Sequence, residues 1–221
     1  LLVGHITPVS IAAGKSLSGA ITVTAGSIKL NEPGTLASTI AMSGGTLDAD
    51  ESSTVSGALT QTADITIDVA TGKTLTYSGA SVNLGAKTMT LSGGGTLSNT
   101  NALVLNYTTS KLLLNSITVD SVSTSANSLG LDVDNNSTIT ALSVGHITPV
   151  SIAASKSLSG AVTVTAGSLK LNETGTLAST IAMSGGVLDA DETSTVSGGL
   201  SHTADITIDV ASGKTLTYSG A

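Results

Sequence analysis

The chain has 221 residues, with 25 Gly, 3 Pro, no Cys, no Trp and no Phe, and its formal net charge is -7. Hydrophobic residues make up 40% of it and charged residues only 10%, a balance that excludes a disordered chain. An acidic chain without Arg, with three Tyr as its only rings, is excluded as a nucleic-acid binder, and the lack of Cys excludes disulfides and zinc–thiolate sites.

The apolar residues are almost all aliphatic, and Ser and Thr hydroxyls are abundant along the whole chain. Because large rings usually fill a globular core, this composition predicts apolar material buried in thin, regular slices. No apolar run reaches the roughly 18 residues of a transmembrane helix, so we expect no membrane span in this segment. The chain opens Leu1-Leu2-Val3 without a signal-peptide pattern, and we expect it to be a piece of a longer protein.

An internal repeat organises the whole chain. Residues 3–80 recur at 144–221 with an offset of 141, and 68 of these 78 positions are identical. Such near-identity is typical of a tandem array. We therefore expect one continuous domain over 1–221, made of a full repeat at 3–143 and a partial second copy at 144–221.

A shorter period lies within the long one, marked by a hydroxyl residue followed by an aliphatic one. The markers, in chain order, are Ser16-Leu17, Thr35-Leu36, Thr54-Val55, Thr74-Leu75, Thr96-Leu97, Ser116-Ile117, Thr138-Ile139 and Ser157-Leu158. Their spacing is nearly constant, so that seven short units of about 20 residues each make one long repeat.

Each short unit shows about three alternating segments that predict strands. The first unit has SLS, AITVTA and SIKLN within 16–31, and the second has TLA, TIAMS and TLDAD within 35–50. The unit from Thr74 continues with TLTYS, SVNLG and KTMTLS. Gly, Asn and Ser between the segments are turn residues, and β-branched residues favour strand over helix.

Three short strands per coil of about 20 residues, repeated in register, predict an all-β fold: a parallel β-solenoid, or β-helix. Coils stacked about 4.8 Å apart would make each seven-coil repeat about 34 Å long. We expect right-handed coils, because the coil length varies. In the predicted core, Val55 aligns with Leu75, Ile117 aligns with Leu97, and Leu129 and Leu131 both point inward.

Two strings carry a resemblance to known proteins: GKTLTYSGASVNLGAKTMTLSGGGTLSN at 72–99 and TVTAGSIKLN at 22–31. They resemble the strand repeats of bacterial autotransporter passengers and are similar to the β-helices of filamentous-haemagglutinin-like adhesins. The resemblance extends over the whole chain. It implies a surface or secreted protein that forms a long stalk, and it implies no site residues, because the strings hold no catalytic or ligand motif.

Catalytic signals are weak. His5 and His146 occupy the same repeat position, and His202 stands where the first copy has Gln61, so no nucleophile–histidine–acid spacing emerges. Glycoside hydrolysis needs two positioned carboxylates. The acidic cluster recurs in both copies, as a structural feature would. We expect a protein that is not an enzyme.

The same acidic cluster is the one candidate for a metal. Carboxylate oxygens suit Ca²⁺, although the glycine-rich calcium repeat is incomplete here. The competing interpretation is solvated charge, with Lys29 partly pairing Asp48. The candidate calcium ligands are Asp48, Asp50, Glu51, Asp189, Asp191 and Glu192.

The marker strand also predicts a hydroxyl-rich face, because 13 of its 14 outward positions over seven coils are Ser or Thr. Three interpretations stay open: wettable strand formers, lateral packing or O-glycosylation, and ice binding. The residues of this possible surface face are Thr54, Thr74, Thr76, Thr96, Thr138 and Thr140.

The sequence thus favours a structural stalk or fibre segment of a long tandem-repeat adhesin-like protein, at the cell surface or outside the cell. The expected partners are further copies, end to end or side by side, or a cell or host surface. The alternative is a binding module that uses the hydroxyl-rich face for ice, glycan or lateral self-association.

Overall fold

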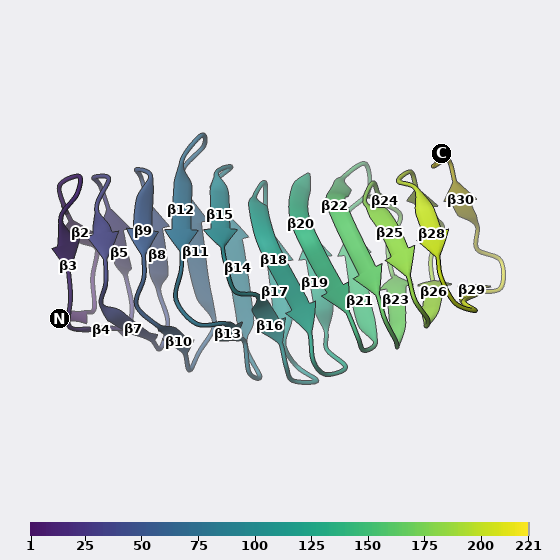
Figure 1. The fold of residues 1–221 in the computed structure, drawn as a ribbon, viewed down its shortest axis with the longest axis horizontal. Helices are drawn as coiled ribbons and strands as arrows, with labels where there is room; N and C mark the ends of the chain where they lie inside the picture. Colours follow the sequence, from purple (N-terminus) through teal and green to yellow (C-terminus); the bar gives the residue numbers. More distant parts are fainter. Residues whose placement is uncertain (221) are drawn as a thin grey trace.

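The fold is a rod of stacked β-coils. The computed structural model describes residues 1–220, with the side chain of Pro8 outside the described part. All regular elements in these residues are β-strands, and Figure 1 shows them side by side from the N-terminal to the C-terminal end. Every ladder between named strands is parallel, so the predicted parallel β-solenoid is confirmed.

Three sheets form the sides of the rod. The eleven-stranded sheet contains β2 (Thr7–Val9), β5 (Ser27–Leu30), β8 (Thr46–Ala49), β11 (Ile65–Val69), β14 (Thr88–Ser92), β17 (Lys111–Leu114), β19 (Gly130–Val133), β21 (Thr148–Ile152), β23 (Ser168–Leu171), β26 (Val187–Ala190) and β29 (Thr207–Val210). The four-stranded sheet contains β1 (Leu2–Val3), β4 (Ala20–Val23), β7 (Thr39–Met42) and β10 (Leu59–Gln61).

The fifteen-stranded sheet carries the hydroxyl-rich strands. Its main path is β3 (Ser16–Leu17), β6 (Thr35–Leu36), β9 (Ser53–Val55), β12 (Thr74–Tyr77), β15 (Thr96–Asn99), β18 (Thr118–Thr124), β20 (Ser137–Val144), β22 (Ser157–Val164), β24 (Thr176–Leu177), β27 (Ser194–Val196) and β30 (Leu216–Tyr218). Four more strands join it beside this path: β13 (Val82–Asn83), β16 (Leu103–Leu105), β25 (Thr180–Met183) and β28 (Leu200–His202).

The long repeat corresponds to a whole number of coils. In the eleven-stranded sheet the path from β2 to β21 takes seven steps, and β21 is the counterpart of β2 in the second copy. The predicted seven coils per long repeat are therefore confirmed. Each copy ends where the next can continue the same ladders.

The cross-section changes along the rod. Most coils have three strands, but β18, β20 and β22 each run unbroken over two sides. The segment 157–164 forms the single strand β22, whereas its first-copy counterpart 16–23 is divided into β3 and β4. The strand β20 pairs with β22 on both sides of a bulge between Ile139 and Ala141. A neighbouring coil therefore influences how nearly the same sequence folds.

The core is a continuous aliphatic column, with residues such as Leu36, Leu75 and Leu97 at most 1% exposed. The inward direction predicted for Leu129 is wrong, since its side chain is 53% exposed while Leu131 and Val133 face the core. Leu129 lies in a corner, where its amide donates a hydrogen bond to the Ser110 carbonyl of the preceding coil.

Each coil depends on its neighbours for burial. Leu17 in the first coil is 39% exposed, but its counterpart Leu158, which has coils on both sides, is fully buried. Likewise Ile208 is 50% exposed and Ile67 only 2%. Stability in such a rod comes largely from the interfaces between coils.

We expect Ser155→Gly to stabilise the protein. Ser155 has a φ of 62°, while its first-copy counterpart Gly14 adopts a φ of 72° with open space around it. The left-handed conformation costs a residue with a Cβ about 1–2 kcal/mol, more than the entropy cost of about 0.5–1 kcal/mol for an added Gly. The net gain should be about 0.5–1 kcal/mol in urea unfolding, and Gly14→Ser should lose as much. A lower urea midpoint for Ser155→Gly would contradict this.

Candidate functional site

The strongest candidate site is the set of outward Ser and Thr residues on the marker strands along the main path of the fifteen-stranded sheet, which we call the hydroxyl face. Ladder register arranges its Ser and Thr residues into three files that overlap along the rod. The first file is Ser16, Thr35, Thr54, Thr76 and Ser98. The second is Thr74, Thr96, Thr118, Thr138 and Ser159. The third is Ser157, Thr176, Thr195 and Thr217.

The structure brings together most of the threonines that the sequence singled out. Thr54 pairs with Thr76 in one file, and Thr74 pairs with Thr96 in the next. Thr138 continues the second file, whereas the exposed Thr140 lies beside it and donates a hydrogen bond of 3.4 Å to Asp120.

One member of the second file was aligned wrongly from the sequence. The marker Ser116-Ile117 placed Ser116 beside Thr96, but the structure places Thr118 there, between Thr96 and Thr138. Ser116 instead occupies a turn with a φ of 56°. A Ser with left-handed backbone conformation is seldom predictable from the sequence. The shift by two residues leaves the same side of the strand facing outward.

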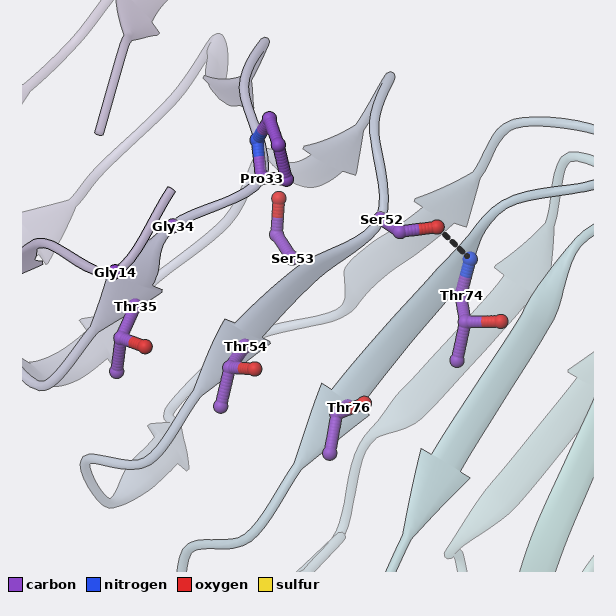
Figure 2. A pocket seen from close by; sticks show the side chains of 9 residues that line it. All are labelled: Gly14, Pro33, Gly34, Thr35, Ser52, Ser53, Thr54, Thr74 and Thr76. Carbon is purple, nitrogen blue, oxygen red and sulfur yellow. Dashed lines mark hydrogen bonds between the residues drawn. The ribbon is translucent and has the colours of Figure 1, made fainter. Parts of the chain in front are cut away.

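Two shallow hollows lie on the hydroxyl face. The first has a volume of about 340 Å³, and Figure 2 shows Thr35, Thr54 and Thr76 in a row along it, with hydroxyls on one side and methyls on the other. At its edge the Thr74 amide donates a hydrogen bond of 3.1 Å to the Ser52 hydroxyl. The second hollow, about 290 Å³, is lined by Gly94, Gly95, Ser116, Ile117, Thr118, Asn136, Ser137, Thr138, Ser157 and Ser159.

The hydroxyls of the hydroxyl face differ in their hydrogen-bond partners from those on another side of the rod. Thr39, Thr60 and Thr180 each donate a hydrogen bond to a carbonyl of the preceding coil. Within the described residues, the hydroxyls of the central threonines have no protein partner, although Thr138 shares a hydrogen bond with Ser159. The residues with unpartnered hydroxyls include Thr35, Thr54, Thr74, Thr76, Thr96 and Thr118.

The candidate calcium ligands lie at another corner, where lysines pair with them. The Lys29 ammonium is 3.1 Å from Asp48 and 2.9 Å from Asp50, and Lys170 makes the matching pairs with Asp189 and Asp191 at 3.2 and 3.0 Å. Calcium would have to displace these ammonium groups. The glutamates pair elsewhere, Glu51 with Lys73 and Glu192 with Lys214, both at 2.6 Å.

The donor set therefore fits lysine better than calcium. Within the described residues, no three acidic or histidine side chains converge on a point that a metal could occupy. The calcium hypothesis stays a prediction. Calorimetric titration with Ca²⁺, together with thermal melting in EDTA, tests it directly.

We expect Lys29→Gln to raise the pKa of Asp48. Burial raises the pKa of this carboxyl above its ordinary value, and the hydrogen bond from Lys29 opposes that rise. Without the ammonium the upward shift should grow, which NMR titration of the carboxyl carbon would measure. Lys15→Gln, at an exposed lysine, is the control. An unchanged or lower pKa in Lys29→Gln would contradict the expectation.

The two pKa shifts act on stability in different pH ranges. Because the folded pKa of Asp48 is raised, its ionised form weakens the fold above that pKa, and this penalty disappears as pH falls through it. Hydrogen bonds to Asp50 and then Asp48 raise the pKa of Lys29. Its stabilising contribution is therefore complete below the ordinary pKa of lysine and is lost as pH rises through the raised value.

The three histidines give no catalytic arrangement. All are exposed, and His202 places Nδ1 3.2 Å from the Ala204 carbonyl. Within the described residues, neither His5 nor His146 has a side-chain hydrogen bond to a nucleophile or a carboxylate. That the protein is not an enzyme stays a prediction.

Fold and face together place this chain in the class of tandem-repeat parallel β-solenoids. Comparison with protein families, curated proteins and solved structures finds no match to it. Of the residues described, none forms a helix long and apolar enough to span a membrane.

Proposed function

We propose that this chain is a non-catalytic structural rod, a segment of a long adhesin-like fibre at the cell surface or outside the cell. The observation that carries the proposal is the match between repeat and coil, since one long repeat makes seven whole coils. Added copies can therefore extend the two long sheet paths and the core without a break. Copy number then sets the length of the fibre.

The physical chemistry of the coil supports a mechanical role. Parallel ladders join every coil to the next along the eleven-stranded sheet and the main path of the fifteen-stranded sheet, and the aliphatic core continues through the interfaces. The third side is interrupted once, between β10 and β13. A structure in which each unit contacts only its neighbours can be lengthened without changing its cross-section. The partners in this role are further copies of the chain or a cell or host surface, reached by the end of the rod.

Length measurement tests the proposal. Chains of one, two and three repeats should increase in length by about 34 Å per copy in small-angle X-ray scattering and negative-stain images, at about 4.8 Å per coil. A radius of gyration that grows only as about the 0.38 power of chain length, as in compact domains, would contradict it.

Localisation needs its own experiment. Antibodies raised against the rod should label intact cells that carry the gene as strongly as permeabilised cells. A cytoplasmic protein, labelled only after permeabilisation, is the control. Labelling of the rod that requires permeabilisation would overturn the surface assignment and leave the mechanical role to the length measurement.

A further inference from the structure

The hydroxyl face is a two-dimensional array. Neighbouring members of a file are one strand apart, about 4.8 Å, and residues such as Thr74 and Thr76 add a second row about 6.6 Å away along the strand. The array continues through the rod because each file overlaps the next: Thr74 lies beside Thr76, and Ser157 beside Ser159. Regular spacing in two directions favours a ligand that is itself periodic.

The chemistry of the array is uniform as well as its spacing. Thr35, Thr54 and Thr76 share one side-chain orientation, so hydroxyls form one row and methyls another (Figure 2). Their hydroxyls have no partner among the described residues, unlike the carbonyl-bonded threonines of β7 and β10. Unpartnered hydroxyls must hydrogen-bond to something outside the protein.

The spacing identifies what that partner can be. Two waters that hydrogen-bond tetrahedrally to a common third water, each at about 2.75 Å, lie about 4.5 Å apart. The strand spacing exceeds this by only about 0.3 Å, so three steps from Thr74 to Thr138 accumulate about 0.9 Å. A file of four threonines can therefore match a tetrahedral water lattice along its whole length. We propose that the hydroxyl face binds the surface of an ice crystal.

The support beneath the face suits this ligand. The inward neighbours Leu75, Leu97 and Val119 are at most 1% exposed, so the array rests on a close-packed core and is ordered before it meets the lattice. Asp120 is the one carboxylate among the files, and it accepts hydrogen bonds from Ser98 at 2.7 Å and Thr140 at 3.4 Å. The threonine rows before it carry no charge that would hold disordered water.

Other periodic ligands fit the face less well. Flat polysaccharide surfaces are gripped largely by aromatic rings, and the described outward positions of this face carry none. The exposed Tyr218 is the last-coil counterpart of the buried Tyr77 and occupies an inward position. A second copy would have to bury rows of hydroxyls, and its partner hydroxyls would need matching geometry. The inference does not depend on the rod being a stalk, because the array would bind ice wherever the protein is located.

The test is ice-recrystallisation inhibition and thermal hysteresis with the chain of residues 1–221. The wild type should inhibit recrystallisation, and Thr76→Tyr should raise the concentration needed by about tenfold or more, a loss of about 1.4 kcal/mol or more. Tyr suits strands, so the fold should persist, while its ring holds the crystal away from neighbouring coils. The matched control is Thr60→Tyr, an exposed position on β10, which should retain full activity.

Several outcomes would overturn the proposal. A wild type without activity at any concentration would do so, as would equal losses in Thr76→Tyr and Thr60→Tyr. Sedimentation velocity addresses the rival occupant: dimers that disappear in Thr76→Tyr, without ice activity in either protein, would assign the face to a second copy. Circular dichroism confirms that each variant is folded. The length per repeat, measured by scattering, tests the structural-rod proposal independently of ice binding.

Discussion

Replacing Gly130 with Ala is expected to lower the free energy of unfolding by about 3 kcal/mol or more, from backbone strain together with overpacking. Gly130 begins β19 with a φ of +84°, and a Cβ there would lie 1.8 Å from the Pro149 carbonyl oxygen of the next coil. That oxygen belongs to β21, so it cannot retreat without separating two strands of the eleven-stranded sheet.

The control separates the close approach from the backbone conformation. Gly72 has a similar φ of +75°, but a Cβ there would meet nothing within 4 Å. Gly72→Ala should therefore cost only the conformational term, about 1–2 kcal/mol. Urea unfolding followed by circular dichroism measures both variants, and amide exchange at Val133 and Ile152 should show the ladder around Gly130 opening first. Equal losses in the two variants would mean that the contact with Pro149 is relieved at no cost.

Coil length and coil number could be predicted from the sequence because they follow from chemistry that repeats. A hydroxyl followed by an aliphatic residue marks a strand with one outward and one inward side chain, and its spacing gives the coil. The outward positions of the hydroxyl face were predictable for the same reason. Side chains alternate strictly along a strand, so inward and outward are fixed once one position is known.

Ladder register could not be predicted, because a slip by two residues changes no side chain from inward to outward. The markers aligned Val55 with Leu75, but Val55 pairs with Tyr77, and Leu75 pairs with the buried Ser53. Both alignments keep the same side chains inward, and the observed one pairs an aliphatic residue with a hydroxyl or a ring, so the hydrophobic pattern does not reveal it. The choice depends on corner lengths and turns, which vary from coil to coil.

The hydrogen-bond partners of surface hydroxyls could not be predicted from the sequence either. Thr60 and Thr76 are both outward threonines on parallel strands, yet only Thr60 bonds a carbonyl of its neighbour. The difference arises from where each strand lies relative to the preceding coil. In the same way Lys29 was expected to pair with Asp48, but its additional pairing with Asp50 depends on the turn that follows β8.

Asn99→Ala is expected to cost about 3 kcal/mol or more, because it would leave several part-buried backbone groups without the partner they have in a buried side chain. Asn99 is 3% exposed at the end of β15. Its side-chain nitrogen donates to the carbonyls of Asn101 at 3.0 Å and Ser121 at 2.7 Å, and its oxygen accepts from the amides of Asp120 at 3.1 Å and Ser121 at 3.2 Å.

Asn99 provides the junction between two kinds of coil. The strands β15 and β16 are separate, whereas β18 runs straight past the corner between them. Register pairs Leu97 with Val119 and Leu103 with Val122, so Asp120 and Ser121 lie opposite the interruption. The carboxamide of Asn99 supplies there the donor and acceptor that a strand backbone would otherwise provide.

Two further variants sharpen the measurement. Asn83→Ala, at an exposed position on β13, should change the urea unfolding free energy by no more than about 0.5 kcal/mol. Asn99→Gln keeps the carboxamide but displaces it by one methylene, so it should recover little of the loss. If Asn99→Ala were no worse than Asn83→Ala, the stacking of a straight coil on a bent one would have to depend on other contacts. A loss in Asn99→Ala much larger than that in Asn83→Ala would instead show that the Asn99 side chain is needed where the cross-section of the rod changes.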